Sequence, residues 1–283
     1  MLTIRDAQAL RRELALWQIR DLTTGFVPTM GALHEGHLSL VRLARERAAR
    51  VVVSIFVNPT QFGPKEDFSR YPRQPEKDAE MLAAAGCDLL FLPEVETIYP
   101  PGSSTFVEPG GPAEGLEGTL RPGHFRGVAT VVCTLLNLVR PDVAVFGKKD
   151  GQQLAVVRQM VRDLAIPVDV VAAETVREDD GLALSSRNAY LSPEERRAAP
   201  VLYRALRAAE QAIAAGERRG DEVRQAMLEI LENEPLARIE YAEVVDAETF
   251  RPVDTLTGSL VLPLAVRIGG TRLIDNFQLV VGD

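Results

Sequence analysis

The sequence predicts an α/β protein in which a parallel sheet with helices on both faces precedes a smaller α+β domain with an antiparallel sheet. Over the first 175 residues, short β-branched runs alternate with amphipathic helical segments. The β-branched runs are continuously apolar, which is typical of parallel strands that are covered on both faces. After about residue 175 the chain becomes polar, then helical, and ends in three alternating runs. We therefore place the domains at residues 1–175 and 176–283.

The strands expected in the first domain are short runs of mostly apolar residues. They cover residues 22–27, 51–57, 88–92, 142–146 and 167–171. Amphipathic helices are expected between them, near residues 36–49, 75–85, 127–139 and 151–164. In the first of these helices Leu40, Leu43 and Ala44 share one face, and Arg42 and Arg45 lie on the opposite face.

The second domain begins with clear helix signals. Ser192 and Glu195 form a capping box, and Pro193 occupies the first helical position. An Ala-rich helix is expected from there to about residue 215, with a kink at Pro200, and a second helix is expected near 221–233. Alternating runs near 238–246, 259–267 and 271–281 predict the antiparallel sheet.

The composition excludes several classes of protein. The formal net charge of −8 argues against a general nucleic-acid binder, whose affinity would come from a basic surface. No apolar run approaches the roughly 18–20 residues that a membrane span needs, and the N-terminal segment lacks the apolar core of a signal peptide. Cys87 and Cys133 lie among apolar residues, which indicates free thiols in a reducing cytoplasm. We expect a cytoplasmic protein with no membrane or nucleic-acid partner.

The polar segments that follow the predicted strands are the expected location of function, because open parallel sheets bind ligands beyond the carboxyl ends of their strands. PTMGALHEGH follows the first predicted strand, NPTQFG the second and GKKDGQQ the fourth. A long segment rich in Gly and Pro, residues 99–127, ends in RPGHFRG, and such long loops are often binding loops. The segment SSRN lies at the domain junction.

His34 and His37 open the helix at 36–49 and allow three interpretations. A zinc site would need a third ligand, but His124 is remote and no HExxH or cysteine cluster is present, so no metal ligand is predicted. A structural role as a helix cap is the second interpretation. The third, which we favour, is phosphate binding, because a helix N-terminus offers unpaired N–H groups and partial positive charge. Gly31 and Gly36 would let a ligand approach the backbone.

Two other nucleotide-binding patterns are absent. The first predicted strand is not followed by GxGxxG, and Asn58 stands where a dehydrogenase would carry an acidic residue after the second strand. The Walker pattern GxxxxGK[ST] is also missing.

The ordered set of motifs resembles a known family. HEGH and SSRN resemble the HIGH and KMSKS-type signatures of the nucleotidyltransferase-like Rossmann group. PTMGALHEGH, SIFVNPTQF, RPGHFRGVATVV, FGKKDGQQL and DGLALSSRN occur in this order across residues 28–188, and TRLIDN follows near the C-terminus. By this set the chain is identified as a member of the pantothenate synthetase (pantoate–β-alanine ligase) family, which implies a Rossmann-like first domain.

The resemblance implies an enzyme, a ligase that forms a C–N bond. This family uses ATP and Mg²⁺ to condense (R)-pantoate with β-alanine to (R)-pantothenate, and it releases AMP and pyrophosphate. The pantoate carboxylate attacks the α-phosphorus of ATP to give a pantoyl adenylate, and the amine of β-alanine then expels AMP. The family is typically homodimeric.

The resemblance also assigns site residues. Those expected to act in catalysis are His34, His37, Lys149, Ser185, Ser186 and Arg187, with His37 as the proton donor. Those expected to line the ATP site are Met30, Gly31, Ala32, Leu33, His34, Glu35, Gly36, His37, Gly147, Lys148, Lys149, Asp150, Val176, Leu184, Ser185, Ser186 and Arg187. Among them, Lys149 is expected at the phosphates, Asp150 at the ribose and Val176 at the adenine. Substrate binding is assigned to Gln61, Gln153, Pro28 and Asn58.

The chemistry of these residues agrees with the assignment. Attack on phosphorus leaves the protein mainly positioning and charge stabilisation to supply. Neutral amides such as Gln61 and Gln153 can orient a carboxylate without quenching it as a nucleophile. Two positions depart from the family pattern, since Lys148 replaces a common acidic residue and Leu184 a common methionine. Asp78 is not assigned to Mg²⁺, which we expect ATP oxygens to hold.

Two other functions remain open from the sequence. A nucleotidyltransferase would use the same fold and motif but release a stable nucleotidyl product. A non-catalytic nucleotide-binding protein would bind ATP without turnover.

Overall fold

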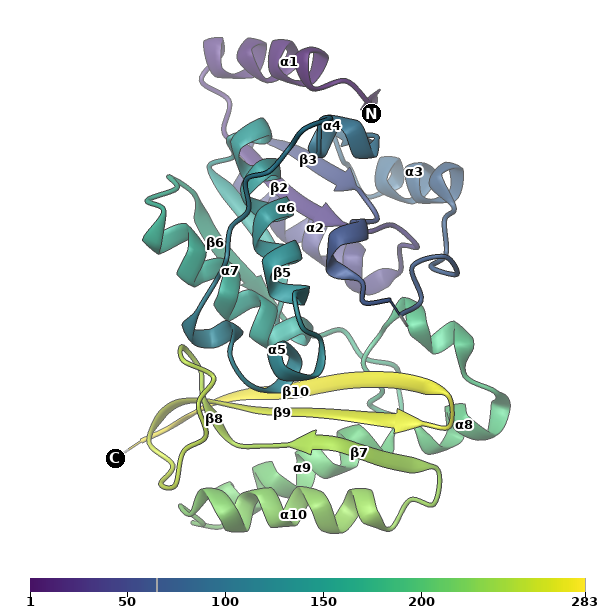
Figure 1. Cartoon of the computed structure of the whole chain (residues 1–283), viewed down its shortest axis with the longest axis vertical. Coiled ribbons are helices and arrows are strands. Elements are labelled where there is room, and N and C mark those ends of the chain that lie inside the picture. Colours follow the sequence, from purple (N-terminus) through teal and green to yellow (C-terminus); the bar gives the residue numbers. More distant parts are fainter. Residues whose placement is uncertain (65, 283) are drawn as a thin grey trace.

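The computed structural model describes residues 1–64 and 66–282, and it contains two sheets (Figure 1). The first sheet has six strands in the order β1-β4-β3-β2-β5-β6, and every neighbouring pair is parallel. The strands are β1 (Leu2–Ile4), β2 (Thr24–Thr29), β3 (Arg50–Ile55), β4 (Leu89–Phe91), β5 (Val143–Gly147) and β6 (Asp169–Ala173). The predicted parallel sheet is confirmed, and the five expected strands lie within two residues of their predicted starts and ends.

Helices cover both faces of this sheet, as the apolar strand runs predict. The helices α2 (Glu35–Arg47) and α3 (Pro75–Ala84) pack against one face through an apolar cluster that includes Val41 and Leu82. A larger cluster on the other face joins three more helices to the sheet. These are α1 (Ala7–Ile19), α6 (His124–Val139) and α7 (Gly151–Asp163). Strand residues Val51–Val53 are fully buried, which explains why the sequence shows no alternation there.

The first strand, the helix α1 and the interior of the long loop were not among the predicted elements. β1 is three residues long, too short to give a periodic pattern, and it pairs with β4 at the edge of the sheet. Residues 99–127, predicted as a loop, contain α5 (Leu116–Leu120) and the first turn of α6, and α4 (Val95–Ile98) lies just before them. α6 therefore begins three residues before the predicted position, at His124.

The start of α6 packs directly on the turn that follows β3. A Cβ atom on Gly127 would lie 2.5 Å from the carbonyl oxygen of Thr60, in the short 3-10 turn Pro59–Gln61. Only glycine permits this approach without displacing one of the two backbones. The motif RPGHFRG is thereby packed against the motif NPTQ, although some 60 residues separate them in the sequence.

The C-terminal part of the chain combines three helices with an antiparallel sheet. The helices are α8 (Pro193–Ala198), α9 (Val201–Ala214) and α10 (Gly220–Glu232), and the strands are β7 (Ala237–Ala242), β8 (Val245–Asp246), β9 (Gly258–Ile268) and β10 (Thr271–Val281). All described pairs in this sheet are antiparallel, as predicted. The predicted capping box is present. The long helix expected to kink at Pro200 is instead divided there into α8 and α9, because proline cannot donate the hydrogen bond that would continue the helix.

The two sheets face each other across the loops at the carboxyl ends of the parallel strands (Figure 1). Helices α9 and α10 lie on the far side of the antiparallel sheet, and β10 runs along the side near α5 and α7. The division at residue 175 stays a prediction. None of the helices in the described residues combines the length and apolar character that a membrane crossing requires.

A buried carboxylate at this junction connects the two parts. The Glu117 carboxylate, on α5, accepts hydrogen bonds from Arg272 at 2.6 and 2.9 Å and from the Tyr241 hydroxyl at 2.8 Å. Its side chain is only 6% exposed. Burial acts to raise the pKa of Glu117, but the hydrogen bonds and charge of Arg272 outweigh it and hold the pKa below its ordinary value. Glu117 is therefore a charged group whose hydrogen-bonding side-chain partners come from the opposite sheet, and Arg121 adds a longer ion pair at 3.7 Å.

Replacing Glu117 by glutamine should strongly destabilise the fold. The change removes a buried charge and leaves Arg272 with only Glu240 as a counter-ion, a situation that typically costs about 3–5 kcal/mol. Glu114→Gln is the matched control, because the ion pair of Glu114 with Arg251 is exposed and should contribute less than about 1 kcal/mol. Urea unfolding at pH 7 measures both. Equal losses in the free energy of unfolding would contradict the role given to Glu117.

Candidate active site

The two histidines of the HEGH motif form the cap of helix α2. His34 is the N-cap residue, and its Nδ1 accepts a hydrogen bond from the Gly36 N–H at 3.2 Å. His37 Nδ1 in turn accepts from the His34 N–H at 3.3 Å. The two half-buried rings lie 4.1 Å apart between centroids. The structural interpretation of these histidines is therefore correct for Nδ1 of each ring, and no hydrogen bond within the described residues uses Nε2 of either ring.

Both histidines are neutral at pH 7 and carry their proton on Nε2. Burial, followed by the nearby charge of Lys149, lowers the pKa of His34 to about 4. Burial, with His34 and Lys149 adding to it, lowers the pKa of His37 to about 3. Because each Nδ1 accepts a backbone N–H, the proton of each neutral ring must be on Nε2. The N-terminus of α2 thus carries two additional N–H donors.

A buried aspartate holds the loop that leads into α2. The Asp78 carboxylate accepts hydrogen bonds from the backbone N–H groups of Ala32 and Leu33, both at 2.9 Å. Gly31 and Ala32 adopt the left-handed region, with φ of 82° and 51°. Asp78 therefore shapes the loop and is not placed as a metal ligand. Among the described residues, no group of three or more His, Cys, Asp or Glu side chains is arranged to hold a metal ion.

Asn58 and Gln61 have different roles in the turn after β3. Asn58 is 1% exposed and donates both of its amide hydrogens, to Gln61 Oε1 at 3.1 Å and to the Gly127 carbonyl at 3.1 Å. Its Oδ1 accepts from Tyr99 Oη at 2.8 Å. Gln61 directs its own amide nitrogen toward Met30 Sδ at 3.0 Å. Asn58, which the sequence assigned to substrate, thus orients Gln61 in this structure.

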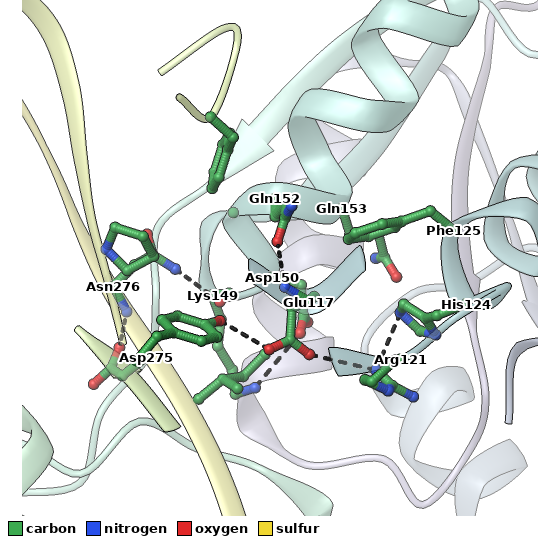
Figure 2. Close-up of a pocket in the computed structure, with 15 residues that line it drawn as sticks. Glu117, Arg121, His124, Phe125, Lys149, Asp150, Gln152, Gln153, Asp275 and Asn276 are labelled. Carbon is green, nitrogen blue, oxygen red and sulfur yellow. Dashed lines mark hydrogen bonds and ion pairs between the residues drawn. The ribbon is translucent and has the colours of Figure 1, made fainter. Parts of the chain in front are cut away.

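The adjacent glutamines at the start of α7 also differ. Gln152 is buried and binds the 112–117 segment through the Glu117 N–H and the Pro112 carbonyl. The Gln153 side chain makes no hydrogen bond within the described part of the chain and points into a pocket at the junction of the two sheets (Figure 2). Of the two glutamines, Gln153, which was predicted to bind substrate, is the one whose side-chain amide has no hydrogen-bond partner among the described residues.

Lys149 and Asp150 line this pocket together with Gln153. The pocket does not extend to His34 and His37, although Lys149 is close enough to lower the pKa of both. Its further lining residues include Arg121, His124, Phe125, Tyr241 and Asn276. Lys148, also predicted at the nucleotide, lies outside this lining and pairs with Glu174.

Sequence reasoning did not assign Arg121 and His124, yet both contact Gln61. His124 Nδ1 donates to the Gln61 carbonyl at 2.9 Å, and its Nε2 accepts from Arg121 at 3.1 Å. Burial and the charge of Arg121 lower the pKa of His124 to about 4, so this ring is neutral. Arg121 forms a two-bond ion pair with Glu66 at 2.6 and 2.7 Å. The motif RPGHFRG, which contains both residues, was the available signal.

The SSRN segment lies over the start of α2. The Leu184 N–H donates to the Val176 carbonyl at 3.0 Å, which places the two predicted nucleotide residues side by side. A Cβ atom on Gly36 would lie 3.7 Å from the Cβ of Leu184. The structure thereby brings the two signature motifs together.

Two polar residues of SSRN, Ser186 and Arg187, contact the segment after β3. Ser185 Oγ caps the following turn by accepting the Arg187 N–H at 3.2 Å, and Ser186 Oγ lies 3.4 Å from the Tyr71 hydroxyl. Arg187 pairs with Asp67 through Nε and Nη2, at 3.1 and 3.0 Å. No hydrogen bond within the described residues uses the Nη1 of Arg187.

The lowered pKa values predict a pH dependence of stability. In the unfolded chain His37 takes up a proton below its ordinary pKa of 6.5, whereas in the folded protein it stays neutral down to about pH 3. The unfolded state therefore binds more protons in this range, so the folded state loses stability as the pH falls below 6.5. Between pH 7 and pH 5, His37 accounts for up to about 2 kcal/mol of this loss.

His37→Asn should therefore lose less stability than the unmodified protein over the same pH interval. Urea unfolding at pH 7 and pH 5 gives this difference for each protein, so that any uniform destabilisation by the substitution cancels. An unchanged pH dependence would show that folding does not lower the pKa of His37.

Comparisons with known proteins agree with this geometry. The family model described as pantoate-beta-alanine ligase matches residues 2–278. The pantothenate synthetase of Herpetosiphon aurantiacus is 56% identical over 278 residues, which cover 98% of each chain. That of Chloroflexus aggregans is 59% identical over 90% of this chain and 93% of its own.

Solved structures give the same result. The pantothenate synthetase from Thermus thermophilus has a TM-score of 0.94 at 50% identity, with 99% of this chain and 100% of that chain covered. The pantoate-beta-alanine ligase from Francisella tularensis, solved with beta-gamma ATP and beta-alanine, has a TM-score of 0.78 at 34% identity, over 98% and 97% of the chains. On the match over nearly its full length, the chain belongs to the pantoate–β-alanine ligase family.

Proposed function

We propose that the chain catalyses the ATP-dependent condensation of (R)-pantoate with β-alanine, forming pantothenate, AMP and pyrophosphate through a pantoyl adenylate. The observation that carries the proposal is the meeting of three segments at one edge of the parallel sheet. These are the capped N-terminus of α2, the 147–150 turn and the SSRN segment. Family membership supports the reaction. The Francisella tularensis relative was solved in complex with beta-gamma ATP and beta-alanine.

The triphosphate is proposed to lie against the N-terminus of α2. Backbone N–H groups and the Nε2–H donors of His34 and His37 would face its oxygens. Lys149 would add a full positive charge from the opposite side. The negative charge of the triphosphate favours the protonated form of a nearby imidazole, so binding would raise the pKa of His37 toward the value that a proton donor needs.

Arg187 can join the phosphates without leaving Asp67. Its ion pair uses Nε and Nη2, so the Nη1 group can donate to an incoming oxygen. Asp67 then holds the guanidinium plane in place. Ser185 and Ser186, on the same segment, are proposed as further phosphate donors, and Asp150 and Val176 as ribose and adenine contacts.

The pantoate carboxylate is proposed to bind between Gln61 and Gln153. Neutral amides leave the carboxylate nucleophilic for attack at the α-phosphorus. The nearby Arg121 does not oppose this, because its charge is balanced by Glu66 and Glu117. Asn58 is proposed to act by orienting Gln61, with Pro28 in the wall beside it.

Mg²⁺ is proposed to enter with ATP. The described residues provide no cluster of carboxylates or histidines for it, and both oxygens of Asp78 already accept backbone N–H groups. The residues fit an ion that is held by phosphate oxygens and retains water ligands. When bound, Mg²⁺ would neutralise part of the charge on the departing pyrophosphate.

We further propose a cytoplasmic homodimer with no nucleic-acid or membrane partner. The homodimer rests on the family resemblance. The cytoplasmic location is supported by Cys87 and Cys133, both of which are free thiols.

ATP and pantoate without β-alanine should yield about one pyrophosphate per active site and a bound, acid-labile pantoyl adenylate. Attack at the α-phosphorus is the step that produces this pair, and adding β-alanine should then release AMP and pantothenate. Rapid quench with labelled pantoate measures the intermediate. Formation of ADP and phosphate would indicate an acyl phosphate instead, and a nucleotidyl product inert to β-alanine would indicate a nucleotidyltransferase.

Gln61→Ala and Gln153→Ala should impair the use of pantoate while ATP binding survives. Each removes a partner from a desolvated substrate group, at about 1–3 kcal/mol, or roughly 5- to 150-fold in kcat/KM for pantoate. Gln159→Ala is the control. Gln159 lies on α7, the helix of Gln153, and its side chain forms hydrogen bonds only with Asp163 and Arg162 at the surface. Loss of ATP affinity with normal dependence on pantoate would contradict the assignment.

A further inference from the structure

Two adjacent residues of strand β10 contact the 147–150 turn and the hairpin that leads into the SSRN segment. Asn276 Nδ2 donates to the carbonyl oxygens of Lys148 and Lys149, at 2.9 and 2.8 Å. The Asp275 carboxylate pairs with both terminal nitrogens of Arg177, at 2.6 and 2.9 Å. Figure 2 shows the two side chains on β10 beside Lys149 and Asp150. Neither residue is among those that the sequence or the proposed chemistry assigns.

The Asn276 amide fits closely against the turn that carries Lys149. Asn276 is 6% exposed, and both hydrogens of its amide are donated to this turn. A Cβ atom on Gly151 would lie 3.2 Å from both the nitrogen and the oxygen of the amide. The two carbonyls flank the Cα of Lys149, so fixing them fixes the direction in which the Lys149 side chain leaves the backbone.

Asp275 acts on the other segment through Arg177. The Asp275 side chain is 2% exposed, so its ion pair is shielded from water. Arg177 Nη1 also donates to the Gly181 carbonyl at 3.0 Å, across the hairpin closed by the hydrogen bond between Val176 and Leu184. That hairpin runs directly into residues 184–187. Asp275 is therefore connected to the SSRN segment through Arg177 and this hairpin.

Strand β10 is a rigid base for both contacts. It pairs with β9 along its full length, from Thr271 to Val281. The Cα atoms of neighbouring residues are about 3.8 Å apart, so the two loops are tied to points that cannot move relative to each other. Binding groups held on rigid strands are positioned more accurately than those on loops alone.

We propose that Asp275 and Asn276 are positioning residues for ATP. Asn276 aims Lys149 at the phosphates, and Asp275 places the SSRN segment opposite, through Arg177. The proposal rests on the proposed function, specifically on the assignment of the 147–150 turn and the SSRN segment to ATP. It adds the C-terminal sheet as the element that sets the distance between them.

The test compares Asn276→Asp with Asn276→Ala. Asn276→Asp keeps the size of the side chain but turns a carboxylate toward two carbonyl oxygens, whereas Asn276→Ala only removes the donors. We expect the KM for ATP to rise about tenfold or more, with Asn276→Asp the more severe, and the KM for pantoate to stay within about twofold. The matched control is Asn233→Asp, because exposed Asn233 donates to the Glu229 carbonyl at 2.7 Å on α10. It should leave both KM values unchanged.

Two outcomes would overturn the proposal. One is a folded Asn276 variant with unchanged KM for ATP, or with equal rises for ATP and pantoate. The other is failure of both Asn276 variants to fold, judged by circular dichroism, which would assign Asn276 to stability alone. Lys149→Ala, measured in parallel, separates this proposal from the function on which it rests. If Lys149→Ala also leaves the KM for ATP unchanged, the assignment of the turn to ATP fails; if it alone raises that KM, only the role of Asn276 fails.

Discussion

The junction between the two sheets depends on the ion pair of Glu117 with Arg272. A buried carboxylate is unfavourable unless its partners compensate the loss of water, and here Arg272 and Tyr241 both come from the antiparallel sheet. Arg272 lies on β10, three residues from Asp275. The ion pair therefore holds the same strand that contacts the 147–150 turn, and Glu117 itself lines the pocket into which Gln153 points.

Polar side chains around the site fall into two groups. Asp78, Asn58 and Gln152 are buried and use their hydrogen-bonding groups on the backbone or on other side chains. The Gln153 side chain and the Nε2 atoms of the two histidines have no hydrogen-bond partner among the described residues, and these are the groups that we propose to bind ligands. Buried polar groups are normally paired with a hydrogen-bond partner. The first group therefore holds the loops in place without using the hydrogen-bonding atoms of the second group.

The sequence was sufficient for the architecture and for the motif-bearing loops, because apolar periodicity and chain order determine which strand ends share an edge. It could not separate Asn58 from Gln61, or Gln152 from Gln153, because each pair differs in which hydrogen-bond partners the fold brings to the amide, and those partners are distant in sequence. Arg121 and His124 were missed since residues 99–127 have no periodicity from which their contacts with Gln61 could be inferred. The short strand β1 was not predicted for a similar reason, because three residues are too few to show a periodic pattern.

The neutral state of the two histidines has a consequence for turnover. A pocket built from several permanent cations would bind pyrophosphate nearly as tightly as ATP, and release of that product would then limit the rate. If the triphosphate lies where we propose, two of its partners are uncharged N–H groups whose pKa values of about 4 and 3 return once the anion leaves. The attraction of the two rings for the anion would rise with the charge that the anion brings and fall as pyrophosphate departs. The enzyme would then bind a highly charged substrate and still release its product.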